Sequence, residues 1–405
     1  ASDRLRVDTR FYLSQVETQA LYYNIVGFPS VYPNDVNVTE LDVRVNNPGV
    51  NDRDLSQLSL KIDYDADWGT FTSITSLDTI EEILTGDQWE FLPYDESIIP
   101  GAIGVDRAQH QYLDVETTSQ EFRFTSPDEG RLRWIGGVYF VQTDRFISTG
   151  NIADRAMNSL GAIPVYRNPI SAESYFVDSA NDQITFLADG QDNFAWAVFG
   201  ELTYDISDRT EVAFALRYDE DERENTTLTP STFLVPFGLP DVSGESRTET
   251  WDELQPRVSL AYKPSETLTV YGSVGRGFRS GGFNQTGVGA DTVAIDQGIV
   301  DLFNAEVADT LEVGVKSVLA DGRVSLNASV FDTEAEGSYF FVFLDASSTQ
   351  NLGSLGAVDY QGFEFDVTAR LTDYLDLTFA YGYTDSEIKA YNVDPAAVGN
   401  DAPYI

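Results

Sequence analysis

The loops of this sequence alternate strictly between two lengths, and this regularity restricts the possible folds more than any other feature. Segments in which apolar and polar residues alternate follow one another along the chain. The connections between them are by turns short and long: a tight turn of a few residues is followed by a long polar insertion, and then by a tight turn again. β-Sandwiches and propellers mix loop lengths at both ends of their sheets. The pattern therefore predicts an antiparallel all-β fold with its tight turns at one end and its long loops at the other. The predicted turns lie near Trp68, Glu129, Ser207, Ser265, Asp321 and Asp373.

The segments themselves have the two-residue period of strands with one apolar face. In FAWAVFGELTYDISDRTEVAFALRYDEDER, Val198, Leu202 and Phe214 share one parity, whereas Glu201 and Arg217 have the other. We count about thirteen such strands, most of them about ten to fourteen residues long. This length suits a tilted membrane-spanning strand, and aromatic residues end the apolar face. The sequence predicts the wall of a transmembrane antiparallel β-barrel, with short periplasmic turns and long extracellular loops.

The parity of each strand predicts which side chains face lipid and which face the lumen. The predicted lipid set is Trp196, Val198, Leu202, Phe214, Leu216, Leu326, Phe365 and Phe379. The predicted lumen set is Arg4, Arg6, Glu201, Arg217, Glu312, Lys316 and Arg370. Arg276 has lipid parity by simple alternation, so we expect a glycine bulge at Gly275 or Gly277 to reset the register, with snorkelling as the alternative. Glu201 and Arg217 are close enough in their hairpin to pair diagonally.

Composition excludes several classes of function. The 405 residues contain no cysteine and one histidine, His110, so thiol chemistry and multi-histidine metal or catalytic sites are excluded and an enzyme is not expected. The net charge of −41 argues against nucleic acid as a partner. Most of the acidity lies in the long insertions. Two interpretations stay open: solvated loops, or an acidic rim beside lipopolysaccharide that divalent cations or high salt must neutralise.

Four segments resemble a known family, the TonB-dependent receptors of Gram-negative outer membranes, and in particular iron-complex receptors of sphingomonad-like and marine bacteria. The segments are YGSVGRGFRSGGFN, ADTLEVGVKSVLADGRVSLNASVF, FGELTYDISDRTEVAFALRYDED and YQGFEFDVTARLTDYLDLTFAYGYTD. The resemblance implies a 22-stranded barrel around a plug. On this basis residues 1–405 form part of one barrel domain, about the fifth to seventeenth strands, and the plug and C-terminal strands are expected outside this sequence.

The resemblance implies active import across the outer membrane, most simply of a ferric siderophore or other iron chelate. Oligosaccharide or cobalamin uptake, a passive porin-like barrel and a secreted glycan-binding β-protein are the alternatives. Expected partners are the TonB complex through an N-terminal segment, outer-membrane lipid, lipopolysaccharide, the transported ligand and, as a further option, a surface lipoprotein or another outer-membrane protein. No cofactor is implied.

In this family the cargo is contacted by residues of the loops and plug apex, often aromatic. The matching positions here are Trp89, Tyr94, His110, Tyr112, Arg279, Phe283, Tyr339, Phe340 and Phe341. Packing of the loops against one another is the alternative role for each of them.

Overall fold

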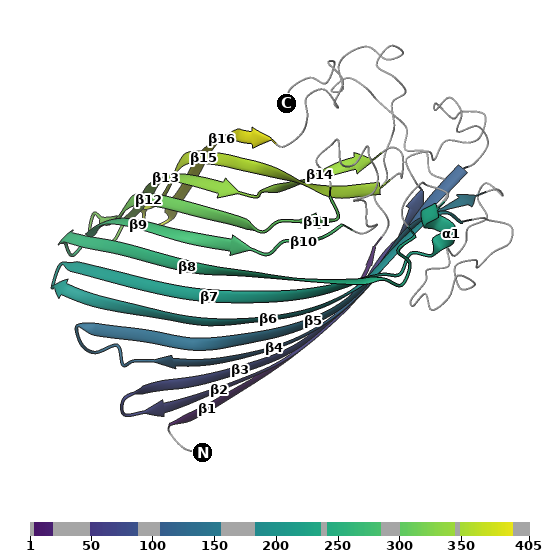
Figure 1. The fold of residues 1–405 in the computed structure, drawn as a ribbon. Coiled ribbons are helices and arrows are strands. Elements are labelled where there is room, and N and C mark those ends of the chain that lie inside the picture. Colours follow the sequence, from purple (N-terminus) through teal and green to yellow (C-terminus); the bar gives the residue numbers. More distant parts are fainter. Residues whose placement is uncertain are drawn as a thin grey trace, which may run out of the picture.

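The computed structural model describes residues 4–18, 49–87, 106–154, 183–235, 241–284, 300–344 and 349–391. They form a curved sheet, a short helix and a small second sheet (Figure 1). The main sheet contains β1 (Leu5–Thr18), β2 (Val50–Ala66), β3 (Gly69–Asp87), β4 (Asp106–Thr125), β5 (Leu132–Asp154), β6 (Gln183–Ser207), β7 (Thr210–Thr227), β8 (Ser246–Ser265), β9 (Leu268–Arg279), β12 (Glu306–Leu319), β13 (Val324–Glu336), β14 (Tyr339–Leu344), β15 (Thr349–Thr372) and β16 (Leu375–Tyr391). The other elements are α1 (Ser231–Leu234), β10 (Gly282–Phe283) and β11 (Leu302–Phe303).

Every ladder of the main sheet is antiparallel, and its strands follow one another in sequence order. Fourteen strands belong to the sheet, but β14 pairs only with the loop-side end of β15, so thirteen strands form the wall itself. The six short turns lie together at one end, at the left in Figure 1. Backbone hydrogen bonds join neighbouring hairpins there, such as Asp205 N to Arg131 O and Lys263 N to Arg209 O, 2.8 and 2.7 Å long. The predicted strand number and turn placement are confirmed.

The first turn shows why a glycine follows Trp68. Gly69 has φ of 149°, and a Cβ at this position would overlap the carbonyl oxygen of Thr125 on β4. Only glycine adopts this backbone without strain. The turn is thereby held tightly against the next hairpin, where Trp68 stacks on Phe124 with ring centroids 6.1 Å apart.

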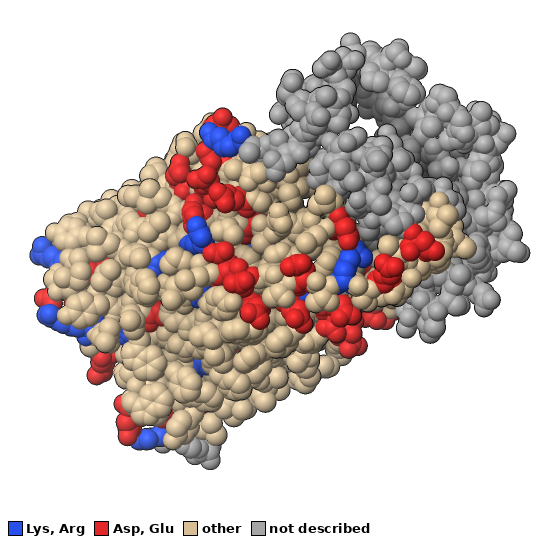
Figure 2. Space-filling view, in the orientation of Figure 1, with Lys and Arg blue, Asp and Glu red and all other residues tan. Residues whose placement is uncertain are grey.

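The cross-strand register confirms the division of side chains between two faces. Residues directly opposite one another share a face. The predicted lipid set occupies one face throughout; Val198, for example, lies between Val138 and Tyr218. We call this the apolar face, because nearly all of the wall's exposed aliphatic and aromatic side chains lie on it. The predicted lumen set occupies the opposite face. In Figure 2 an uncharged band lies between charges at the turn end and a mainly acidic zone on the loop side.

Two expectations about individual charges are wrong. The β9–β12 ladder runs without a register shift from Leu268 to Arg279, so no bulge resets Arg276. Its guanidinium instead bonds Asp309, its direct partner on β12, at 2.7 Å, and Glu253 of β8 at 3.2 Å. Arg217 pairs with Asp219 two residues along its own strand at 2.6 Å, in place of the diagonal pair with Glu201.

No helix among these residues is long and apolar enough to cross a membrane. The one helix in the described part of the chain, α1, is four residues long and lies on the loop side.

Candidate ligand-binding site

The sequence-predicted site residues fall into two separate groups. Trp89 and Tyr94 lie outside the described residues. His110 and Tyr112 lie on β4, on the apolar face, whereas Arg279, Phe283 and the run from Tyr339 to Phe341 lie around β9, β10 and β14.

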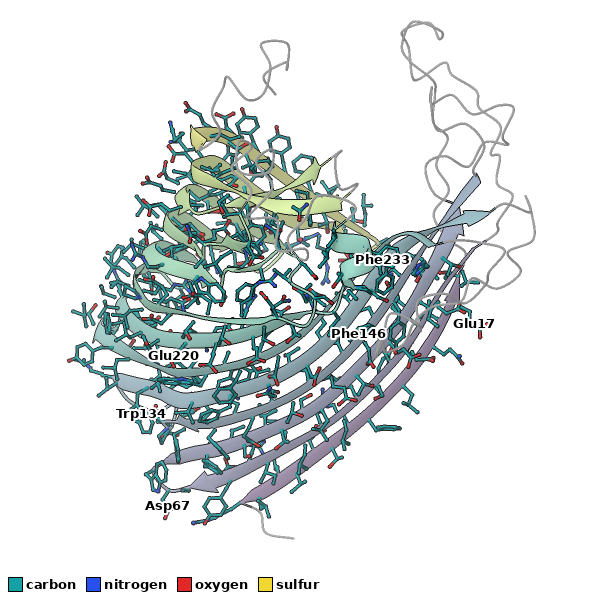
Figure 3. All side chains as sticks on the ribbon, turned by 45° about the vertical axis from the view of Figure 1, so that its right-hand side comes forward. Glu17, Asp67, Trp134, Phe146, Glu220 and Phe233 are labelled. Carbon is teal, nitrogen blue, oxygen red and sulfur yellow. The ribbon has the colours of Figure 1, made fainter. Side chains whose placement is uncertain are left out.

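His110 and Tyr112 belong to a small hydrophobic core beneath α1. Both are 2% exposed, and His110 stacks on Phe186 with centroids 6.3 Å apart. Phe186 in turn packs on Phe233 of α1 at 5.9 Å. Figure 3 shows Phe146 and Phe233 on the loop side, far from Asp67 and Trp134 near the turns. The burial of His110 and Tyr112 favours a packing role over contact with a ligand.

The buried histidine makes this small core sensitive to acid. Burial lowers the pKa of His110 from its ordinary 6.5 to about 4. Between these values the unfolded chain takes up a proton that the folded core does not, so stability is full above about pH 6.5 and falls down to about pH 4. The difference corresponds to about 3 kcal/mol at most. We expect the hydrogen-exchange protection factors around β4 and β6, which are corrected for the intrinsic pH dependence of exchange, to fall from pH 7 to pH 5, and to fall much less in His110→Phe. An identical fall in both proteins would contradict this.

A second group forms a continuous series of arginine–aromatic contacts on the lumen face at the loop end. Arg223 lies over Trp251 at 5.8 Å, Arg247 over Phe283 at 5.2 Å and Arg279 over Tyr339 at 3.9 Å, each measured from Cζ to the ring centroid. Trp251 and Phe283 meet edge to face at 6.0 Å and so connect the first two pairs. We call Arg223, Trp251, Arg247, Phe283, Arg279 and Tyr339 the arginine–aromatic belt.

The belt forms where β8 and β9 stop pairing with each other on the loop side of the wall. The β8–β9 ladder ends at Arg257 and Gly275, next to Pro256, which has no N–H to continue it. β9 instead leads into β10, whose Gly282 and Phe283 pair with β11. The Gly281-Gly282 pair has a packing role at this point. A Cβ at Gly281 would lie 2.7 Å from the Trp251 indole, so this glycine lets the ring rest on the backbone.

Asn284 fastens the end of the belt to the long strand β15. Its amide donates to the carbonyl oxygens of Val300 at 2.7 Å and Leu352 at 2.9 Å, and its side-chain oxygen accepts from Leu352 N at 2.8 Å. Arg247 donates to the Asn284 carbonyl at 2.7 Å. Phe283 is therefore held between β8 and β15, so the aromatic surface is preorganised.

Each belt arginine also pairs with one carboxylate. Arg223 bonds Asp221 at 2.7 Å, Arg247 contacts Asp301 at 2.8 Å and Arg279 bonds Glu306 at 3.0 Å. Burial raises the pKa of Asp301, opposed by the charge of Arg247. The Arg279 side chain is 52% exposed, against 26% for Arg223 and 20% for Arg247. Arg279 thus has the most guanidinium surface left for a ligand.

The belt continues along β14 and includes residues that the sequence did not indicate. Phe341 has the same parity as Tyr339 and is 75% exposed, whereas Phe340 has the opposite parity. Arg223, Arg247 and Trp251 were missed, although their odd parity on β7 and β8 is that of Arg217 and Arg257. Assigning the lumen face by parity along the whole of β7 and β8, and not only along their membrane-spanning parts, would have indicated these three residues.

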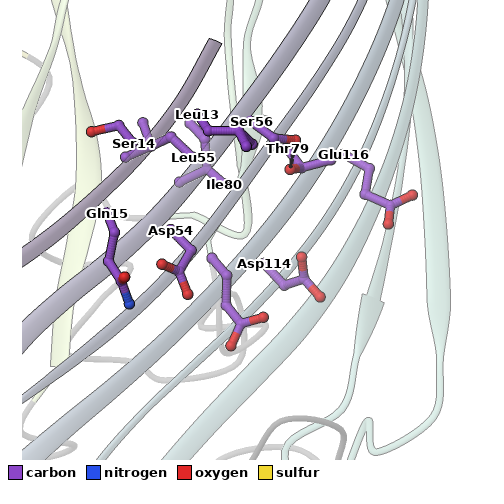
Figure 4. Close-up of a pocket in the computed structure, with 11 residues that line it drawn as sticks. Leu13, Ser14, Gln15, Asp54, Leu55, Ser56, Thr79, Ile80, Asp114 and Glu116 are labelled. Atoms are coloured by element: carbon purple, nitrogen blue, oxygen red, sulfur yellow. Dashed lines mark hydrogen bonds between the residues drawn. The ribbon is translucent and has the colours of Figure 1, made fainter. Parts of the chain in front are cut away.

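The apolar face carries two rows of carboxylates above its apolar band. In the first row Glu116, Asp144, Asp192 and Glu224 are direct cross-strand partners on β4 to β7. In the second, Asp309, Glu334, Asp359 and Glu387 are partners on β12 to β16. Figure 4 shows Asp54, Asp114 and Glu116 among the side chains of a neighbouring hollow. Within the described ranges no group of three or more acidic or histidine side chains has the geometry to hold a metal ion.

We predict that removing one carboxylate charge has opposite effects on thermal stability in the two rows. Arg276 bonds Asp309 in the second row, and Lys389 contacts Asp359 and Glu387, whereas no lysine or arginine of the described residues pairs with the first row. Opposed like charges destabilise a sheet by about 0.2–1 kcal/mol per pair. We expect Asp144→Asn to raise the thermal midpoint, most strongly at low salt, and Asp309→Asn to lower it. Calorimetry at 50 and 500 mM NaCl checks this; equal shifts for both variants would contradict it.

Comparison with known proteins shows which family matches this chain. Residues 3–405 match the model of the TonB dependent receptor-like β-barrel. A curated relative, the probable TonB-dependent siderophore receptor PiuA of Acinetobacter baumannii, is 26% identical over 174 residues, covering 43% of this chain and 21% of that protein.

Solved structures share the fold. The ferric yersiniabactin uptake receptor FyuA of Yersinia pestis aligns with a TM-score of 0.66 and 17% identity over 95% of this chain and 50% of that one. The siderophore receptor PiuA of A. baumannii aligns with a TM-score of 0.62 and 16% identity over 96% and 55%. The chain thus spans about half the length of the solved receptors it matches. The sheet described above is accordingly a segment of a transmembrane β-barrel wall.

Proposed function

This chain belongs to the TonB-dependent receptor β-barrel family, and from that premise we propose that the whole protein imports a ferric siderophore or similar iron chelate across the Gram-negative outer membrane. TonB supplies the energy, through a segment outside this sequence. The observation that carries the proposal is the arginine–aromatic belt on the lumen face at the loop end. The names of similar proteins, which include siderophore receptors, support it.

The chemistry of the belt fits an anionic chelate. Guanidinium groups donate to oxyanions in a fixed geometry, and aromatic rings bind the apolar parts of a ligand by contact area. The chain as a whole has a net charge of −41 and therefore repels anions. An anion is attracted only at places such as the belt, where arginines offset the charge of nearby carboxylates. A neutral oligosaccharide stacks on the rings and accepts hydrogen bonds from the guanidinium groups, but it has no negative charge to attract them. This is why we rank iron chelates above glycans and cobalamin.

A ligand panel tests the proposal. Purified full-length receptor is titrated with ferric catecholate, hydroxamate and citrate chelates, cobalamin and neutral oligosaccharides, with tryptophan fluorescence as the readout. We expect at least one ferric chelate to bind saturably, and we expect no binding of the neutral oligosaccharides. Binding of a glycan alone would replace the iron assignment with carbohydrate uptake, and ion conductance without any binding would favour a passive pore.

We also propose that further strands of the whole protein complete the barrel around a plug. Within the described residues β1 pairs only with β2 and β16 only with β15. An open sheet edge in lipid leaves unpaired backbone groups that each cost several kcal/mol. In the full-length protein, cysteines at Val7 and Phe379 should not form a disulfide. Efficient crosslinking of this pair would show that β1 and β16 close directly on each other.

A further inference from the structure

Two glycines face each other on the apolar face and leave a hollow in its surface. Gly136 of β5 and Gly200 of β6 are direct cross-strand partners. Gly200 lines a hollow with a volume of about 450 Å³, and Gly136 lies directly beside it across the ladder. Its walls are almost wholly apolar, formed by Trp134, Val198, Leu202, Phe214, Leu216 and Leu254.

Packing within the chain does not require a glycine at position 136, whereas position 200 leaves little room for a side chain. A Cβ at Gly136 would meet only the Phe199 carbonyl oxygen, at 3.7 Å, and one at Gly200 only the Ile135 oxygen, at 3.3 Å. Neither glycine has a positive φ. Glycine within a strand is unfavourable because it loses more backbone entropy and packs no side chain. The space is therefore kept open toward the outside of the wall.

We propose that the acyl chain of a membrane lipid binds in this hollow and is retained there. The hollow is continuous with the exposed apolar band, which is the surface that lipid contacts in a transmembrane barrel. An acyl chain has no polar groups to satisfy, and the walls offer almost none. The proposal depends on the wall standing in a bilayer and is independent of the cargo.

The loop-side rim of the hollow suits the polar end of such a lipid. Trp196 and Tyr218 pack together with centroids 5.6 Å apart, and both donate to Glu220, at 3.2 and 3.4 Å. Tryptophan and tyrosine of this kind mark the interface between hydrocarbon and headgroups. A second copy of the chain is the alternative occupant, and the test below distinguishes it from a lipid.

The test compares filled and open hollows in the full-length receptor extracted from outer membranes. Gly136→Val adds a branched side chain directly across from Gly200, at a position where a Cβ meets only an ordinary contact. Val198→Phe fills the hollow from one of its lining residues, which is 49% exposed. Gly272→Val is the matched control, because Gly272 shares the apolar face and a similar 3.7 Å nearest contact but lies outside the hollow. Native mass spectrometry counts retained lipids, and quenching by brominated phosphatidylcholine in vesicles reports contact with the tryptophans.

We expect wild type and Gly272→Val to retain a lipid adduct through detergent exchange. Gly136→Val and Val198→Phe should lower its occupancy at least fivefold, with weaker bromine quenching and unchanged uptake of iron chelate. Equal retention in all four proteins, or no retained lipid in wild type, would overturn the proposal. Dimers of wild type that Gly136→Val dissociates would assign the hollow to a second copy and would also overturn it.

Discussion

Replacing Arg279 with alanine in the full-length receptor is expected to weaken binding of its ferric chelate at least tenfold. Arg279 is the most exposed arginine of the belt, and its guanidinium lies 3.9 Å from the Tyr339 ring centre. A hydrogen bond to a charged group contributes about 1.5–3 kcal/mol, and tenfold in affinity corresponds to about 1.4 kcal/mol. Removal of Arg279 also leaves Glu306 without its 3.0 Å partner, so the site becomes more repulsive to an anion.

Arg370→Ala is the matched control for this experiment. Arg370 is similarly exposed and pairs with Asp376 at 3.3 Å, but it lies at the turn end of the wall. Its loss should leave affinity unchanged. Arg279→Lys, which keeps the charge and loses the planar stacking group, should fall between wild type and alanine. Equal affinities for the Arg279 and Arg370 alanine variants, measured by fluorescence titration, would remove the belt from the binding site.

Adding one methyl group at Gly137 is expected to destabilise the wall by about 2–3 kcal/mol, as overpacking of a filled site does. A Cβ there would lie 2.6 Å from both the Phe122 carbonyl oxygen and Cζ of Phe199. The neighbouring Gly136 points to the apolar face and has room for a Cβ. Gly136→Ala should therefore stay within about 0.5 kcal/mol of wild type.

Urea unfolding of the two alanine variants, refolded in lipid vesicles, measures this difference. The pair shares one strand, one residue type and one depth, so the comparison isolates the face on which the methyl group is added. Equal midpoints for the two variants would contradict the packing described here, and a larger loss in Gly136→Ala than in the Gly137 variant would mean that the register of β5 is displaced by one residue.

The wall could be predicted from sequence because its determinants are local and repeated. The two-residue period places Val198 and Glu201 on opposite faces whatever the neighbouring strands are, and each tight turn reverses the chain within a few residues. The expectation of a bulge at Arg276 was wrong, because simple alternation gives the correct face for this residue. Pairing across strands neutralises this arginine through Asp309 and Glu253, which are far away in sequence.

The candidate ligand site was only partly predictable because it depends on where the β8–β9 ladder stops. The β8–β9 pairing ends at Arg257, and this brings Trp251 against Phe283 and Arg247 against Asn284. No local pattern indicates such contacts. His110 attracted attention as the single histidine of the chain. Its burial against Phe186 depends on the registers of β4, β5 and β6, which place both residues opposite Gly150, and these contacts between distant segments are not visible in the local sequence.

Uptake of iron by living cells tests the central claim most directly. A strain lacking the full-length gene is supplied with radioactive iron on each chelate that the purified receptor binds, with the gene restored and with TonB either present or deleted. We predict that uptake returns with the gene and is lost again without TonB. Uptake that is unchanged by loss of the gene, or that persists at full rate without TonB, would contradict TonB-driven iron import by this protein.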